Sequence, residues 1–328
     1  AEVFAENLKG LSGVVGKPDV KVRAADDSVV GAVKGHVPTT LGGLFGIDRL
    51  NITVTAVAAR KKNGPPCILV LDKSASQSFL INNGATIMSP ECEAHVKSTA
   101  SSAAVFNSGT NLQTRRICIE GTNILNNGGI HPNLELGCKT AADPFAGKLP
   151  QPTATFCDVN NFTYTGSTVT LNPGVYCGWI NFNSGVNVRL NPGLYILRSG
   201  GWNVNGGQWN GDGVSFYFAD QSKIQFNSAV KANLTPPTSG PYADLMFFEK
   251  EGLSRSQFII NDTLGFNISG IVYLPSRDTI FNGNSELRAR TLSLVVNTLT
   301  LNQTNWSLKP GSMALTATAS SNKTRLIE

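Results

Sequence analysis

Short apolar runs separated by glycine- and asparagine-containing turns dominate the chain from residue 63 onward. Examples are 68–71, 214–218, 245–248 and 292–296, and each run ends close to a turn sequence such as Asn-Gly, Asn-Pro-Gly or Ser-Gly. Runs of this length, bounded by turn residues, are typical of β-strands. No helical periodicity interrupts them, so this part of the chain is predicted to consist of strands.

Internal repeats distinguish between the ways in which such strands can be arranged. The sequence Leu-Asn-Pro-Gly-Val-Tyr at 171–176 recurs as Leu-Asn-Pro-Gly-Leu-Tyr 19 residues later, and Asn183, Asn205 and Asn227 follow apolar residues at intervals of 22. Later copies of this asparagine lie at 267, 282 and 302. A unit of about 20 residues is one turn of a parallel β-helix. The alternative, a two-sheet sandwich of hairpins, does not require a recurring unit.

The repeats therefore predict a mainly β protein containing a right-handed parallel β-helix. Stacking would align Asn183, Asn205 and Asn227 in a ladder of side-chain amide hydrogen bonds. The Asn-Pro-Gly sequences would form the corners, because proline fixes φ and glycine accepts a positive φ.

The first 62 residues show a different pattern, which predicts a small α/β neck domain. Residues 21–24, 28–35 and 50–58 have the pattern of strands, and 39–45 resembles a short helix. The basic and proline-rich segment 60–66 then separates this domain, 1–62, from a solenoid domain, 63–328.

Cysteine usage indicates an oxidising compartment. Cysteines lie at 67, 92, 118, 138, 157 and 177, without the CxxC spacing of a metal site. Their intervals favour three local disulfides, Cys67–Cys92, Cys118–Cys138 and Cys157–Cys177, among the roughly 15 pairings that six cysteines allow.

The composition argues against a nucleic-acid-binding protein. The net charge is only +5, and 15% of the 328 residues are charged. The basic clusters at 60–62 and 115–116 lack interleaved aromatic residues.

No apolar stretch reaches the ~18 residues of a membrane span, and the first residues do not resemble a signal peptide, so a targeting segment is expected upstream.

Asp72, Ser74 and Ser76 follow an apolar run with the DxSxS spacing of a metal-dependent adhesion site. A domain that carries such a site needs alternating strands and helices, which this chain lacks. The segment is therefore predicted to be a strand and turn, with a metal-dependent adhesin kept as an alternative.

Candidates for catalysis are scattered. The acids Asp212, Asp220, Asp262 and Asp278, with Arg255 and Arg277, lie singly in turns, where aspartate usually caps backbone N–H groups. His36, His95 and His131 form no known motif and are predicted to lie at the surface or in turns. These patterns predict a protein that is not an enzyme and has no cofactor, with a carbohydrate-binding or carbohydrate-degrading surface protein as the alternative.

Aromatic residues could form a platform on which sugars stack. In repeated strands, however, they are more often core residues and cross-strand pairs. The residues concerned are Trp179, Trp202, Trp209, Trp306, Tyr164, Tyr176, Tyr195 and Tyr217.

Several spaced motifs resemble those of a known family. They are Pro-Cys-Ile-Leu-Val-Leu-Asp at 66–72, Asp-Pro-Phe-Ala at 143–146, Leu-Asn-Pro-Gly-Val-Tyr-Cys at 171–177 and Leu-Thr-Pro-Pro-Thr-Ser-Gly-Pro-Tyr at 234–242. With these motifs the chain resembles a TadE/TadG-like Flp (tight-adherence) pilus-assembly protein. The resemblance implies an N-terminal membrane helix, a location in the periplasm or at the cell surface, and pilus-assembly proteins, pilin subunits or a second copy as partners. It brings no catalytic residue, so we expect a structural or interaction component of the envelope.

Overall fold

A computed structural model describes residues 19–25, 28–39, 42–59, 66–261, 263–283, 285–311 and 325–327. The chain divides into two compact units, which are described separately. Residues 1–63 and 321–328 form the small unit, and residues 64–320 form the large unit. The predicted second domain extended to residue 328, whereas the last eight residues group with the small unit.

The small unit is a four-stranded antiparallel sheet. Its strands are β1 (Asp19–Ala25), β2 (Ser28–Pro38), β3 (Arg49–Ala59) and β25 (Arg325–Ile327), in that order across the sheet. The prediction of a helix at 39–45 was wrong: the described part of this segment holds only a 3₁₀ turn, Gly42–Phe45. Three glycines at 42, 43 and 46 explain the difference, because glycine disfavours a helix and so short a segment cannot offset the cost of nucleation.

The large unit is a β-solenoid of about 11 turns, as the repeats predicted. All pairings between its strands are parallel, which excludes the hairpin sandwich. The first group of strands is β4 (Pro66–Val70), β5 (Phe79–Asn82), β6 (Thr86–Val96), β7 (Ala104–Phe106), β8 (Asn111–Ile119), β9 (Leu125–Asn126) and β10 (Leu134–Leu136). The second group is β11 (Val159–Asn160), β12 (Thr163–Tyr164), β13 (Thr168–Leu171), β14 (Gly174–Phe182), β15 (Asn187–Leu190), β16 (Gly193–Asp212), β17 (Val214–Phe218), β18 (Lys223–Thr235), β19 (Leu245–Glu249), β20 (Ser256–Asn261), β21 (Thr263–Ile268), β22 (Gly270–Asn282), β23 (Glu286–Asn302) and β24 (Asn305–Pro310).

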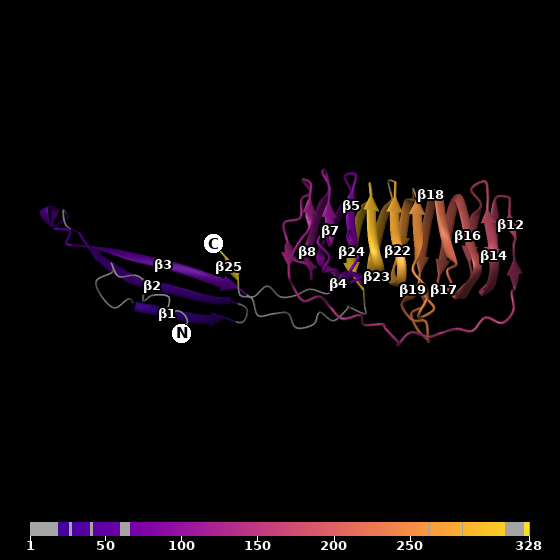
Figure 1. The fold of residues 1–328 in the computed structure, drawn as a ribbon, viewed down its shortest axis with the longest axis horizontal. Coiled ribbons are helices and arrows are strands. Elements are labelled where there is room, and N and C mark those ends of the chain that lie inside the picture. Colours follow the sequence, from indigo (N-terminus) through magenta and orange to yellow (C-terminus); the bar gives the residue numbers. More distant parts are fainter. Residues whose placement is uncertain are drawn as a thin grey trace. The chain divides into compact units, whose positions relative to one another are not determined.

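The order of coils in the stack differs from their order in the sequence. The last coil of the second group lies on the first coil of the first group, because β23 pairs with β4 and β5, and β24 pairs with β6. The chain therefore enters the solenoid in the middle, winds to one end through β10, crosses to the other end, and winds back to the middle (Figure 1).

The crossing segment, residues 137–158, is called the strap here. It runs along the stack from the β8 end to the β12 end (Figure 1). Phe145 packs edge-on against Tyr273 with ring centroids 5.5 Å apart, and Tyr273 Oη donates to Asp143 Oδ2 over 3.1 Å. Arg198 donates to the carbonyl oxygen of Ala154 over 2.7 Å. The strap is thus fastened to several coils of the solenoid.

An apolar column on the outside of one sheet explains the position of the strap. Successive pairings align the residues Val175, Ile196, Tyr217, Phe248, Tyr273, Val295 and Leu69. Phe145, Leu149 and Ala154 of the strap pack against this column. The strands of this sheet are consequently buried on both faces, which accounts for their continuous apolar runs.

The three predicted disulfides are all formed, with Cα–Cα distances of 5.4, 5.8 and 5.7 Å. Cys67–Cys92 joins two neighbouring coils at the point where the chain enters the solenoid. Cys138 and Cys157 stand at the two ends of the strap and are bonded to Cys118 and Cys177 of the solenoid. The disulfides place the protein in an oxidising extracellular or periplasmic environment.

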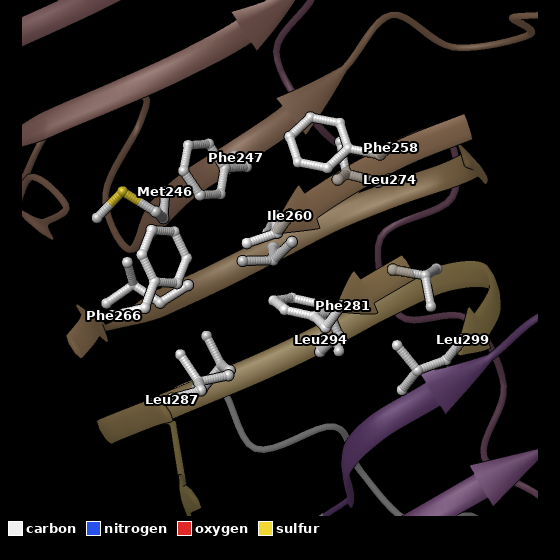
Figure 2. Close-up of a cluster of buried hydrophobic side chains, with 14 of the residues drawn as sticks. Met246, Phe247, Phe258, Ile260, Phe266, Leu274, Phe281, Leu287, Leu294 and Leu299 are labelled. Carbon is white, nitrogen blue, oxygen red and sulfur yellow. The ribbon is translucent and has the colours of Figure 1, made fainter. Parts of the chain in front are cut away.

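Apolar side chains from every coil fill the interior of the solenoid. Figure 2 shows part of this core, in which Phe247, Phe258 and Phe281 lie among leucine and isoleucine side chains. The Asn-Pro-Gly corners also stack on one another: a Cβ atom on Gly193, whose φ is +139°, would lie 2.4 Å from the Pro173 ring. Only glycine therefore fits this corner.

The predicted asparagine ladder is present and continues beyond the three residues expected. Asn205 Nδ2 donates to Asn183 Oδ1 over 2.9 Å, and Asn227 Nδ2 donates to Asn205 Oδ1 over 3.0 Å. The same kind of bond links Asn282 to Asn261, Asn302 to Asn282, Asn82 to Asn302, Asn107 to Asn82 and Asn127 to Asn107. This ladder crosses the junction between the two groups of coils. Asn267, grouped with the ladder on sequence, instead bonds to Asn233 on another sheet.

We predict that Asn205→Leu lowers the free energy of unfolding by about 1–3 kcal/mol, because it breaks two amide contacts at once. Asn160→Leu is the control, since Asn160 is an exposed strand residue. Urea denaturation of both variants measures the difference. Equal losses at the two positions would show that the ladder does not stabilise the stack.

We predict that reduction lowers the melting temperature strongly, because loss of a native disulfide typically costs about 2–5 kcal/mol. Freeing Cys138 and Cys157 would release both ends of the strap. The measurement is calorimetry with and without reductant, together with thiol titration of the denatured, unreduced protein. Detection of six free thiols would contradict the prediction.

Candidate functional site

Asp72, the first residue of the DxSxS motif, holds a turn just after the end of β4. Its Oδ1 accepts backbone hydrogen bonds from Ser74 (2.9 Å) and Ala75 (2.8 Å). Its Oδ2 lies 3.4 Å from a guanidinium nitrogen of Arg255. Ser74 and Ser76 are exposed. Both carboxylate oxygens of Asp72 therefore have protein partners, and the motif forms the strand and turn that the sequence predicted.

Arg255 brings Asp72 and Asp278 together. Its Nε donates to Asp278 Oδ2 over 2.6 Å, and this bond raises the pKa of the guanidinium. Partial burial raises the pKa of Asp72, but the amides of Ser74 and Ala75 together with Arg255 outweigh that effect, and its pKa lies below the usual value. A carboxylate with a lowered pKa stabilises the fold at neutral pH and loses this contribution as pH falls through that pKa.

A buried ion pair lies beside this cluster. Arg277 Nε donates to Glu249 Oε2 over 2.6 Å, and both side chains are 0% exposed. Arg277 also donates to the carbonyl oxygens of Asp220 (2.7 Å) and Gln221 (3.1 Å) and to Ser256 Oγ (2.8 Å). Arg277 thereby ties the turns of successive coils together. A guanidinium enclosed in this way cannot reach a substrate, so Arg277 is no catalytic base.

His95 corrects the prediction that the histidines lie at the surface or in turns. It is 1% exposed, lies on β6, and its Nε2 is 2.9 Å from Glu93 Oε2. Its Nδ1 accepts the backbone N–H of Ala141 in the strap over 2.9 Å. Arg116 links Glu93 to Glu135. This network fastens the beginning of the strap. His131 is half-buried against Phe106, and His36 is half-buried on β2.

The side-chain carboxylates of Asp212 and Asp220 have other partners, although the backbone carbonyl of Asp220 accepts from Arg277. Asp220 caps the backbone N–H groups of Ser199 and Ser222, as predicted for aspartates in turns. Asp212 is exposed and accepts from Thr235 Oγ1 over 2.9 Å. Asp262 lies outside the described residues. Within the described ranges, no group of three His, Cys, Asp or Glu side chains could hold a metal ion.

The aromatic residues mostly belong to the core. Trp202, Trp209 and Trp306 are fully buried, whereas Trp179 is 40% exposed. Tyr217 lies under the strap, with its Oη 3.2 Å from Gln151 Oε1. A sugar-stacking platform made of the three buried tryptophans is therefore excluded.

A large hollow lies on the outer face of the sheet formed by the C-terminal parts of β16 and β18 together with β21 and β24. Its volume is about 1040 Å³. Most of the wall consists of alternate residues of β16, β18, β21 and β24 and of Ser269 directly after β21, and most of these carry an amide or a hydroxyl: Asp212, Asn233, Thr235, Asn267, Ser269, Asn305, Ser307 and Lys309. Leu234 and Ile268 also line it. We call this hollow the polar groove. It crosses the strands and so runs along the stack.

Sequence reasoning missed the polar groove and the Glu249–Arg277 pair. The alternation of Asn233 and Thr235 with buried Ala232 and Leu234 was the available signal for a polar outer face. No comparable signal marked Glu249, because 28 positions along the chain and the strands β20 and β21 separate it from Arg277.

Comparison with known proteins identifies no relative: no family model, no curated protein and no solved structure matches the chain. In the part of the chain that the structure describes, no helix is long and apolar enough to span a membrane.

Proposed function

We propose that the protein is a structural and interaction component of a tight-adherence (Flp-type) pilus-assembly system in the bacterial envelope. The proposal rests on one observation: the acidic, basic and histidine side chains that could have taken part in catalysis or metal binding have structural roles. Glu249, Arg277, His95 and Asp72 all hold coils, turns or the strap in place. The large unit is thus suited to act as a stiff spacer that presents its outer faces to other envelope components.

Two further features support this function. The disulfides at both ends of the strap suit a protein that works outside the reducing cytoplasm. The spaced motifs, including Asp-Pro-Phe-Ala at 143–146 in the strap, resemble the TadE/TadG-like family. In this proposal the partners are pilus-assembly proteins, pilin subunits or a second copy.

Deletion of the gene in the source cell tests the proposal. We expect loss of surface pili and of adhesion, with recovery on expression of the intact gene. The intact protein should also cross-link in the envelope to pilus-assembly proteins or pilins. Normal pili in the deletion strain would overturn the proposal.

The polar groove favours a second candidate function, the binding of a polysaccharide. Its amides and hydroxyls can donate and accept hydrogen bonds, as the hydroxyl groups of a sugar chain require. Asp212 and Lys309 are the described charges in its wall. With one acidic and one basic group in the described wall, neutral and anionic sugar chains are both candidate ligands.

Calorimetric titration with a neutral glucan and with a uronic-acid polymer tests this second candidate. Ser307→Trp should block the groove and abolish binding. Thr170→Trp, an exposed residue on β13 outside the groove, should leave binding unchanged. Failure of both polymers to bind would exclude the candidate, and chain cleavage lost in Asp212→Asn would identify an enzyme instead.

A further inference from the structure

The described part of the small unit carries a cluster of exposed large apolar side chains. Large apolar side chains cluster within eleven residues of the β2–β3 hairpin and are exposed: Leu44 80%, Phe45 84%, Ile47 54%, Leu50 56%, Ile52 42% and Val54 59%. A contiguous exposed patch of this kind marks an interaction site with a protein or a membrane. These six residues are called the apolar hairpin face.

The hairpin geometry places much of this patch on one side of the sheet. Leu50, Ile52 and Val54 alternate along β3 and therefore share a face. The antiparallel register sets Val37 opposite Leu50 and extends the face onto β2. The 3₁₀ turn at the end of the hairpin carries Leu44 and Phe45, which are the two most exposed members.

The other side of the same hairpin is polar. Asn51 and Thr53 alternate with the apolar residues of β3, and Lys34 is in register with Thr53. Lys34 and Arg49 are exposed. The hairpin is thus an amphipathic ribbon whose described basic residues, Lys34 and Arg49, lie on the face opposite the apolar one, with Arg49 close to the tip.

Charge is concentrated in the small unit. Residues 1–63 and 321–328 hold 11 basic and 7 acidic residues, a net charge of +4, whereas the 257 residues of the large unit hold 16 and 15, a net charge of +1. This excess attracts an anionic surface and repels a second copy of the same unit. Lipid is therefore a better occupant of the apolar hairpin face than another copy.

We propose that the apolar hairpin face docks onto a lipid surface that carries anionic headgroups. Leu44 and Phe45 enter the boundary between headgroups and acyl chains, as the apolar side of an interfacial segment does. The net positive charge of the small unit adds a long-range attraction to the headgroups, which acts within about a Debye length of the surface. This contact is independent of the proposed pilus function and of any membrane-spanning helix.

Vesicle flotation of the 328-residue chain tests the proposal. One set of vesicles contains phosphatidylcholine alone, and the other contains phosphatidylcholine mixed with phosphatidylglycerol. We expect binding to the mixed vesicles that weakens as salt is raised. Phe45→Asp should lower the bound fraction by about tenfold or more, because a charge replaces the most exposed ring at the tip.

Phe156→Asp is the matched control. Phe156 is 83% exposed but belongs to the strap of the large unit, so its substitution should leave vesicle binding unchanged. Circular dichroism verifies that both variants fold. No binding to mixed vesicles, or equal binding by Phe45→Asp, would overturn the proposal. So would a concentration-dependent dimer that Phe45→Asp abolishes in the absence of vesicle binding, which would assign the face to a second copy.

Discussion

Replacing Glu249 with glutamine is expected to lower the free energy of unfolding by about 3–5 kcal/mol, because it leaves the buried Arg277 without its counter-charge. The loss is large because Arg277 is fully enclosed and its remaining partners are neutral oxygens. Urea denaturation measures the change, with the same slope of unfolding free energy against urea concentration used for the variant and the unaltered protein.

Two further variants separate the charge effect from the effect of substitution itself. Glu251→Gln changes an exposed glutamate two residues away and should alter stability by about 0.5 kcal/mol or less. The double variant Glu249→Leu with Arg277→Met removes both charges and should cost less than Glu249→Gln alone. A stability of Glu249→Gln equal to that of Glu251→Gln would show that the pair is not enclosed as described.

Trp202→Ala is expected to cost about 3–5 kcal/mol, because it opens a cavity at the centre of an aromatic cluster. The ring of Trp202 lies 5.0–5.9 Å, between centroids, from those of Tyr176, Phe182, Tyr195, Trp209 and Phe216. Thermal and urea denaturation measure the loss.

Trp202→Phe and Trp179→Ala are the controls for this cavity. Trp202 Nε1 has no hydrogen-bond partner among the described residues, so phenylalanine loses no hydrogen bond and should cost clearly less than alanine. Trp179 is 40% exposed, and its loss should have a small effect. A large loss in Trp179→Ala, or a small one in Trp202→Ala, would contradict the assignment of the core.

The period of the coils could be predicted from sequence because each coil repeats local chemistry. Asn183, Asn205 and Asn227 occupy equivalent places 22 residues apart, and the corner sequence around Pro173 recurs around Pro192, 19 residues later. The short intervals between cysteines also limited the pairings, because neighbouring coils bring such residues together. Local patterns of this kind can be recognised in a single sequence.

The order of the coils could not be predicted, because every coil offers the same kind of edge to its neighbours. Nothing in the local pattern indicates that Ile68 lies beside Leu294 rather than at one end of the stack. One local pattern did indicate the strap: a run such as 245–248 is apolar at every position and therefore needs a cover on its outer side. The candidate sites depended on this arrangement, since Glu249, Arg277 and Asp220 meet only after their coils have stacked.

The pairing of β25 with β3 determines how the protein carries a mechanical load. Arg325, Leu326 and Ile327 pair with Ala59, Ala58 and Val57, so both ends of the solenoid chain return to one small sheet. A tension applied between residues on either side of this pairing is borne by β3 and β25 first. The solenoid is inserted in the sequence between β3 and β25, so it bears no tension until this pairing opens. A pull on the chain would therefore stretch the small unit while the rod keeps its length.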